Sequence, residues 1–228
     1  TMAKVYESSG KIEDAEATYR RAVVMRPHSW GIRNMFGSFY FRLGRYAEAE
    51  QQFLKTLELF PDNARTCQNL GSVYTQQQRT DEAVAAFKKA IELAPKYVLP
   101  HSNLGALYFQ QRRYEESARI LERALEINDR NHNIWRTLAA AYSCSKEEKH
   151  KAGAAFQRAL ELGERELLLN PSNVRLLVHL ADCCSQLDQP ERARELLEKL
   201  LACHPKEVSI YFQAAVVYEQ IGDRRNAV

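Results

Sequence analysis

The residue types that most often bind metals or act as nucleophiles are scattered through this sequence of 228 residues. Its five cysteines are an odd number and contain no C-x-x-C pair, so the sequence indicates neither a zinc site nor a disulfide framework. The adjacent Cys183 and Cys184 could take part in redox chemistry, but we interpret the cysteines as small buried thiols in a reducing compartment. The histidines lack a metal-binding spacing such as H-E-x-x-H. We therefore predict no metal site and no cofactor.

The acidic residues and the glycines also lack a catalytic arrangement. The pairs Glu115–Glu116 and Glu147–Glu148 begin predicted helices, where negative charge stabilises the positive end of the helix dipole. The glycines are dispersed along the chain rather than gathered into a phosphate-binding loop. No catalytic residue is assigned, and we predict that this chain is not an enzyme.

Composition limits the classes of partner. Lys and Arg number 32 against 29 Asp and Glu, a net charge of +3, and 45% of the residues are hydrophobic. This hydrophobic share is enough to bury a core, and the near balance of charge argues against a nucleic-acid partner. No apolar run approaches the ~20 residues that span a bilayer, and the N-terminal segment lacks the apolar stretch of a signal peptide. We expect a cytoplasmic location and no membrane insertion.

A period of 34 residues organises the chain. Prolines recur at this spacing at positions 27, 61 and 95, and again at 171 and 205. Asp129, in a turn-like run, stands where the fourth proline of the first series is expected. Within each interval the same residue types return, for example Leu70-Gly71, Tyr74, Ala83 and Phe87 before Pro95. Internal repeats of this length indicate a fold built from one repeated unit.

The periodicity predicts two helices in each repeat. With the recurring proline numbered 32, apolar residues stand at positions 4, 7, 8 and 11 and again at 20, 24 and 27, which places each set on one helical stripe. Small residues at positions 8 and 20 allow the two backbones to approach closely, and the proline ends the second helix. A lone pair cannot bury both stripes, so the pairs must stack. The predicted helices span 30–43 and 46–59, 64–77 and 80–93, and 98–111 and 114–127.

These residues resemble the tetratricopeptide repeat, whose signature is W-x-x-L-G-x-x-Y, then A-x-x-x-F, then P. The resemblance covers essentially the whole chain. It implies an all-α fold, a right-handed superhelical solenoid of antiparallel helix pairs with about seven repeats. The first and the last repeat are expected to be truncated. The expected repeats, within a single solenoid spanning 1–228, are about 1–29, 30–63, 64–97, 98–131, 132–173 (expanded), 174–207 and 208–228.

The fifth repeat is longer than the others. From Asp129 to Pro171 the spacing is 42 residues instead of 34, and most of the excess lies between Ala159 and Pro171. The run from Glu161 to Leu169 contains no proline and several leucines. Seven added residues make about two helical turns, so a longer helix keeps nearly the same exit direction. We predict one continuous helix from about 148 to 169, although Gly163 weakens it by about 1 kcal/mol.

The face opposite the packing stripe is the candidate binding surface. In proteins of the tetratricopeptide family, positions 2, 6, 9 and 13 of each first helix line the concave groove of the superhelix. A peptide backbone needs donors and acceptors together, and an amide side chain supplies both. The predicted peptide-binding residues, taken from this face and its flank, are Met35, Ser38, Arg42, Arg65, Asn69, Ser72, Gln76, Asn103, Phe109, Gln110, Thr137, Arg175 and His179.

Asn69 and Asn103 hold the same position in adjacent repeats and are the predicted central contacts. They resemble the asparagine ladder of O-linked N-acetylglucosamine transferases, but Met35, Thr137 and His179 interrupt such a ladder. The basic residues of a chaperone-binding carboxylate clamp are missing, so a chaperone tail is not a predicted ligand. The alternative interpretation is that these amides are ordinary solvated residues copied by repeat duplication.

The predicted function is a protein–protein interaction scaffold that holds a peptide or extended partner segment in the groove, with a preference for acidic ligands. The run FYFRLGRY at residues 39–46, followed by the long fifth repeat, is similar to arrays attached to bacterial Ser/Thr kinases and adenylyl cyclases. This similarity implies a region of a larger signalling or regulatory protein. Two alternatives are a structural scaffold that self-associates through its uncapped ends, and a substrate-selecting arm of an attached enzyme. Residues 1–9 and 222–228 are expected to be poorly ordered or to pack against another molecule, because neither end has a capping repeat.

Overall fold

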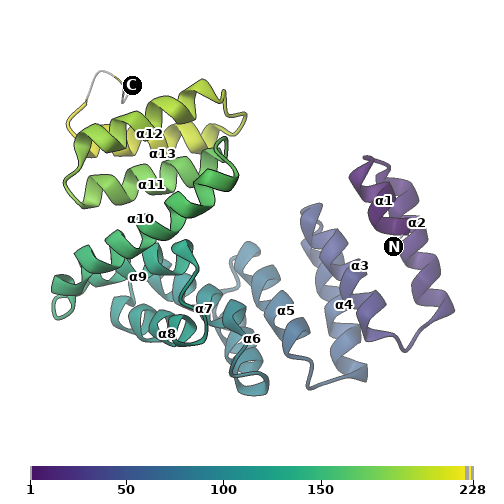
Figure 1. Ribbon diagram of the computed structural model, residues 1–228. Helices are drawn as coiled ribbons and strands as arrows, with labels where there is room; N and C mark the ends of the chain where they lie inside the picture. Colours follow the sequence, from purple (N-terminus) through teal and green to yellow (C-terminus); the bar gives the residue numbers. More distant parts are fainter. Residues whose placement is uncertain (1, 224–225, 227–228) are drawn as a thin grey trace. The chain divides into compact units, whose positions relative to one another are not determined.

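The computed structural model describes residues 2–223 and 226, and these residues form thirteen α-helices, one 3-10 helix and no strand (Figure 1). Each short connection returns the chain alongside the helix before it. In chain order the helices are α1 (Met2–Ser8), α2 (Ile12–Met25), α3 (Trp30–Arg42), α4 (Tyr46–Leu59), α5 (Ala64–Gln76), α6 (Thr80–Leu93), α7 (Val98–Gln110), α8 (Tyr114–Ile127), α9 (His132–Cys144), η1 (Lys149–Lys151), α10 (Ala152–Leu169), α11 (Val174–Gln186), α12 (Pro190–Ala202) and α13 (Val208–Gln220).

The helices group into two units, Thr1–Leu107 and Tyr108–Val228. In the first unit α1 packs on α2, α3 on α4, and α5 on α6, and in the second α9 packs on α10 and α11 on α12. Neighbouring pairs also touch within each unit, as α4 does with α5 and α10 with α11. The predicted all-α fold of antiparallel helix pairs is confirmed. All six spans predicted between residues 30 and 127 agree with the structure to within one residue.

The close approach of the two helices in a pair depends on a residue without a side chain. A Cβ atom added at Gly37 would lie 2.6 Å from the Phe53 ring, and one at Gly71 would lie 2.5 Å from the Phe87 ring. Both rings are almost completely buried. The glycine at position 8 therefore makes room for the aromatic residue at position 24, and this contact forms the centre of the repeat.

The turn inside every described helix pair except α9–α10 uses a left-handed residue at position 15. This residue is Gly44 in the second repeat, with φ at 73°, and Gln78 in the third, with φ at 60°. The following amide then donates back to the carbonyl four residues before the left-handed residue, as Arg45 does to Tyr40 over 3.0 Å. This bond satisfies one of the carbonyls that the end of the first helix leaves without a partner.

An arginine after this turn ties successive repeats together. The guanidinium of Arg45 lies over the Tyr40 ring, 4.5 Å from its centroid, and binds Glu48 at 2.7 Å and Glu16 of the preceding pair at 2.6 Å. Arg79 repeats the arrangement over the Tyr74 ring at 4.3 Å, with contacts to Glu82 and Glu50. Because one acid belongs to the repeat before, the same cation fixes both the turn and the stacking.

The predicted long helix of the fifth repeat is confirmed over its C-terminal part. Helix α10 continues without interruption through residues 163–168 and ends at Leu169. Its start differs from the prediction, because residues 149–151 form the 3-10 turn η1 and the α-helix begins at Ala152. This tighter turn takes up the extra residue between Tyr142 and Ala152. Lys151 there takes the place that Arg45 and Arg79 hold in the second and third repeats, with its Nζ 5.2 Å from the Tyr142 ring centroid.

The expected disorder at the N-terminus is wrong for residues 2–8. They form helix α1, and the buried Ala3 joins the core of the first unit together with Ala15 and Tyr19. Ala3 is the one buried residue of the described helix α1, and α1 packs on α2. Thr1, residues 224–225 and residues 227–228 lie outside the described residues, and packing of either end on another molecule stays a prediction.

Replacing Gly71 by Ala should destabilise the fold, because the added methyl group meets the Phe87 ring inside a packed pair. Overpacking of this kind costs about 1–3 kcal/mol of unfolding free energy. Gly153 in α10 is the matched control, because nothing lies within 4 Å of a Cβ there. Gly153→Ala should be neutral or stabilise the helix by up to about 1 kcal/mol. Urea denaturation of both variants measures the difference, and equal effects would contradict the proposed role of position 8.

Candidate functional site

The predicted groove residues of the second repeat are already engaged within the first unit. The guanidinium of Arg42 forms a two-point ion pair with Glu7, at 2.6 and 2.8 Å. The Ser38 hydroxyl donates to the Asn34 carbonyl over 2.8 Å, and Met35 is half-buried against the core. The positive charge of Arg42 is therefore neutralised before any ligand arrives.

Asn69 links two repeats. Its Nδ2 donates to Oδ1 of the buried Asn34 over 3.0 Å, and the Thr66 hydroxyl donates to the same oxygen over 3.3 Å. The Ser72 hydroxyl is likewise in contact with the buried side chain of Gln68, at 3.0 Å. Asn69, a predicted central contact of the ligand, therefore also takes part in the contact between two repeats. Its amide satisfies a buried acceptor on α3.

The other predicted residues are more accessible or have only local partners. Arg65, Gln76 and Gln110 are exposed, and the Asn103 side chain is half-buried with no hydrogen bond among the described residues. The Phe109 ring packs beside Tyr114, with centroids 5.6 Å apart. Three of the predicted residues contact a partner. The Tyr46 hydroxyl donates to Gln76 over 3.4 Å, and the Thr137 hydroxyl donates to the Asn133 carbonyl over 2.9 Å. Arg175 pairs with Glu207 at 2.8 Å.

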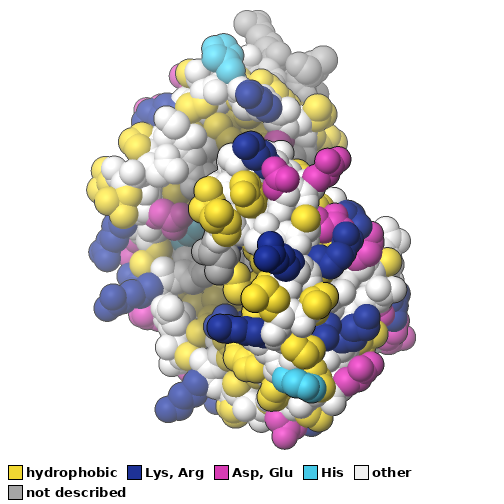
Figure 2. All heavy atoms as spheres, turned by 90° about the vertical axis from the view of Figure 1, so that its right-hand side faces the viewer, with side chains coloured by type: hydrophobic (Ala, Val, Ile, Leu, Met, Phe, Trp, Pro, Cys, Tyr) yellow, Lys and Arg dark blue, Asp and Glu magenta, His cyan; other side chains and the backbone are white. Residues whose placement is uncertain are grey.

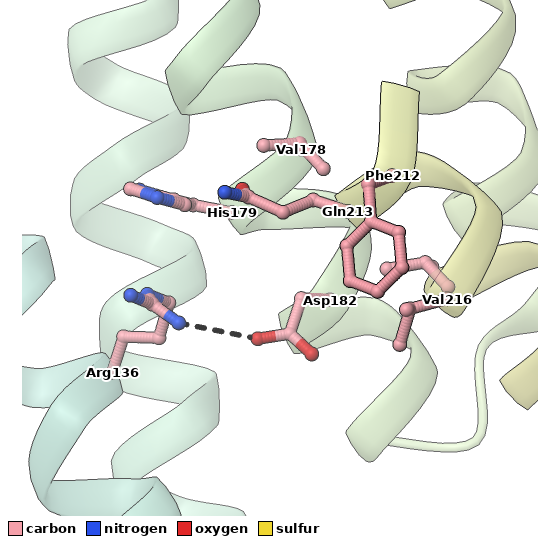
Figure 3. Close-up of a pocket in the computed structure, with 8 residues that line it drawn as sticks. Arg136, Val178, His179, Asp182, Phe212, Gln213 and Val216 are labelled. Atoms are coloured by element: carbon pink, nitrogen blue, oxygen red, sulfur yellow. Dashed lines mark hydrogen bonds and ion pairs between the residues drawn. The ribbon is translucent and has the colours of Figure 1, made fainter. Parts of the chain in front are cut away.

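The second unit contains a cavity of about 390 Å³ on the candidate face of α9, α11 and α13 (Figure 3). Polar side chains line one side of the cavity, and apolar side chains line the other. Of the predicted groove residues, only His179 lines it. The lining residues are Arg136, Val178, His179, Asp182, Phe212, Gln213, Val216 and Val217.

A loose ion pair forms the polar wall of this cavity. Nη1 of Arg136 on α9 lies 3.4 Å from Oδ2 of Asp182 on α11, which is long for a charge-assisted hydrogen bond. Nε of Arg136 is buried and has no partner among the described residues. Burial raises the pKa of the Asp182 carboxyl, and the charge of Arg136 opposes this effect. The guanidinium therefore keeps unused capacity to donate hydrogen bonds.

His179 is a neutral imidazole at neutral pH. Burial, together with the positive charge of Arg136, lowers its pKa to about 3. The Gln213 side chain extends toward it in Figure 3, and the His132 ring centroid lies 6.3 Å away. A neutral imidazole and an amide each combine a donor with an acceptor. Across the cavity, the Phe212 side chain is 71% exposed and stands beside Val216.

Sequence reasoning missed the residues at position 5, which are Arg136, Val178 and Phe212 in the second unit. Position 5 precedes position 9 by four residues and so shares its face of the helix. In the first unit the same position carries the buried polar residues Asn34 and Gln68. The available signal was the chemical change at position 5, from amides in the early repeats to Arg, Val and Phe in the later ones.

The adjacent thiols Cys183 and Cys184 are buried. Burial raises the pKa of the Cys183 thiol to about 12 and that of Cys184 to about 11, so both stay protonated at neutral pH. Across the described residues there is no group of three or more metal-binding side chains, and no helix is long and apolar enough to cross a membrane. Figure 2 shows one face of the molecule, where basic, acidic and apolar side chains are interspersed.

Family comparison agrees with this architecture. Models of the tetratricopeptide repeat match residues 1–29 and 31–96, and another matches 74–142 and 151–216, more than half of the chain. The chain belongs to the tetratricopeptide repeat family. Among curated proteins, no sequence matches it significantly. Proteins with this repeat generally mediate protein–protein interaction and typically act as scaffolds without catalytic activity.

Several solved structures share the tetratricopeptide fold with this chain. A tetratricopeptide repeat protein from Parabacteroides merdae ATCC 43184 is 17% identical, with a TM-score of 0.68 over 99% of this chain and 86% of its own. The Cut9–Hcn1 hetero-tetramer of the APC/C is 17% identical, with a TM-score of 0.75 over 99% of this chain and 43% of the other. YrrB, described as a TPR protein with an unusual peptide-binding site, is 21% identical, with a TM-score of 0.50 over 77% of this chain and 87% of its own. These identities show the fold alone, and attachment to a kinase or cyclase stays a prediction.

Folding stability should fall in acid partly because of His179. Its pKa is about 3 in the folded protein and 6.5 in an unperturbed chain, so between these pH values the unfolded state binds a proton that the folded state does not. Above pH 6.5 the histidine is neutral in both states and does not lower the free energy of unfolding. As the pH falls below 6.5, the free energy of unfolding decreases. From pH 7 to pH 5 the wild type should lose about 1–2 kcal/mol more than His179→Gln. Urea denaturation at both pH values measures this, and parallel losses would contradict it. The lowered pKa of His132 and the raised pKa of Asp182 are common to both proteins.

Asn69→Ala should lower the free energy of unfolding by about 1 kcal/mol, because Oδ1 of Asn34 loses a donor inside the stack. Asn103 occupies the same position in the next repeat without a hydrogen bond among the described residues, so Asn103→Ala is the matched control. Its effect should stay within about 0.5 kcal/mol. Thermal and urea unfolding of the two variants decide between them. Equal stabilities would show that the Asn34–Asn69 contact contributes nothing.

Proposed function

We propose that this chain is an interaction module that holds an extended segment of a partner protein on the candidate faces of its first helices. The observation that carries the proposal is the cavity between α9, α11 and α13, where polar groups and an exposed phenylalanine converge. Folding alone gives no reason for a phenylalanine that is 71% exposed beside a cavity. A ligand that covers Phe212 gains the free energy of burying it.

The chemistry of the cavity favours an apolar anchor residue flanked by peptide backbone. Phe212 and Val216 offer a surface for a bulky apolar side chain. The Gln213 amide and the Asp182 carboxylate lie close enough to that surface to bond the N–H and C=O groups of the flanking peptide. Arg136 and Asp182 cancel in charge, so the cavity as a whole is neutral at neutral pH. The anchor residue itself is therefore uncharged.

The acidic preference predicted from the sequence has its strongest support at Arg65. Its side chain is exposed and has no ion-pair partner among the described residues, and it precedes the Asn69 face of α5. Arg42 and Arg175 contribute less, because Glu7 and Glu207 already pair with them. A carboxylate on the ligand gains most where it does not have to displace an internal acid. In this proposal an acidic residue of the ligand binds best at Arg65.

A place within a larger signalling or regulatory protein is part of the same proposal, supported by the resemblance of residues 39–46 to arrays joined to such enzymes. The candidate faces would then select the substrate or the regulator of the attached domain. Self-assembly through the ends is the second candidate function. It is favoured by the apolar residues Val208 and Tyr211, which are 82% and 43% exposed on α13.

The test uses peptides selected from a random phage-displayed library on the wild-type chain, with affinities measured by fluorescence anisotropy. Phe212→Ala should weaken the tightest peptides roughly ten- to a hundred-fold, the loss expected for one buried aromatic contact. Tyr211→Ala is the matched control, because it removes a neighbouring exposed aromatic residue that does not line the cavity. Its effect should stay below about three-fold. Circular dichroism verifies that both variants fold. Peptides that bind Phe212→Ala as tightly as the wild type would place the site elsewhere.

A further inference from the structure

The extra turns of α10 carry two leucines into solvent. Leu168 is 82% exposed and Leu169 is 88% exposed, the highest value for a large apolar side chain in the described part of the chain. Both belong to the segment that makes the fifth repeat longer than the others. Side chains in this state gain nothing from folding, and covering them would remove apolar surface from water.

A groove of about 720 Å³ lies beside these leucines, between the end of α10 and helix α12. Leu167, Leu196 and Pro171 supply its apolar part, and charged side chains supply the rest. Leu168 forms part of its wall, whereas Leu169 is not among the lining residues. One surface therefore carries both an apolar projection and an apolar hollow.

The charges around this groove are of both signs. Glu164 on α10 is paired with Arg192 on α12, and Glu161 is paired with Arg158. Three other charged lining residues, Arg165, Glu195 and Lys199, form no ion pair with any described residue. A purely acidic or purely basic partner segment would leave one sign of these charges unmatched. A partner surface that carries the same two signs offers a base to Glu195 and an acid to Arg165 and Lys199.

We propose that this α10–α12 surface, formed by Leu167–Leu169, Leu196, Arg165, Glu195 and Lys199, binds the same surface of a second copy of the chain. A two-fold axis places each projection opposite the hollow of the other copy and each free acid opposite a free base. Leu169 of one copy then enters the groove of its partner. Glu195 of each copy faces the basic pair Arg165 and Lys199 of the other. The dimer leaves the cavity of α9, α11 and α13 to the peptide ligand.

Sedimentation equilibrium of the 228-residue chain, from low micromolar to several hundred micromolar concentration, tests the proposal. The expected result is a reversible monomer–dimer equilibrium. Leu169→Ser should raise its dissociation constant at least about ten-fold, because the projection loses its apolar side chain. Val208→Ser is the matched control, since Val208 is also 82% exposed but lies on α13, at the end that self-assembly would use. Neither side chain packs inside the monomer, so circular dichroism and thermal melting should match the wild type.

Charge reversal gives an independent readout. Glu195→Lys alone and Lys199→Glu alone should each weaken the dimer, because like charges then face one another across the axis. An equimolar mixture of the two variants should form a heterodimer at least as readily as the wild type dimerises. A chain that stays monomeric throughout overturns the proposal and leaves the groove to a different partner. A dimer abolished by Val208→Ser and unaffected by Leu169→Ser overturns it as well, in favour of association through α13.

Discussion

The close contact between the two helices of each pair is the constraint on which the rest of the molecule depends. Gly37 against Phe53, and Gly71 against Phe87, bring the backbones together until no space for a Cβ atom remains. In the second unit Ala139 takes the place of the glycine, and Phe156 is buried on the second helix. Once this contact fixes the rotation of the first helix, its opposite side must face away from the pair. The candidate binding faces therefore follow from the core rather than from any feature of their own.

Stacking makes use of the same faces that could bind a ligand. Asn34 and Asn69 join α3 to α5 by a hydrogen bond, and Arg42 reaches Glu7 on α1. These contacts stabilise the array and at the same time occupy the groups that a peptide would need. The proposed ligand contacts lie where these repeating contacts are weak. At Arg136 the bond to Asp182 is long and Nε has no partner among the described residues, and Phe212 is 71% exposed.

The helices could be predicted from the sequence because each one depends on a local pattern. Proline, the small residue at position 8 and the apolar stripe recur at fixed spacing, and the six spans predicted between residues 30 and 127 fall within one residue of those observed. The partners of the groove residues could not be predicted in the same way. Arg42 and Glu7 are 35 residues apart, as are Asn69 and Asn34, so each contact depends on which side chain the neighbouring repeat presents. His179 was found from its position alone, whereas the cavity it lines also required Arg136 and Phe212 at position 5, which was not among the expected positions.

The fifth repeat shows how an irregular segment can keep the regular stacking. Gly163 lowers helix propensity at the middle of the extension, by about 1 kcal/mol relative to alanine. The structure gives the compensation, because Gly163 is buried and α11 packs directly over it. A Cβ there would lie 3.3 Å from Cδ1 of Leu176 and would collide with Cδ2 of Leu180. Gly163 thus allows α10 and α11 to approach closely, as Gly37 and Gly71 at position 8 do for the two helices of a pair. Helix α10 packs closely on α11, and its added turns end in Leu168 and Leu169, which are exposed to solvent. An insertion that preserves the stack therefore also creates the most exposed leucines of the described chain.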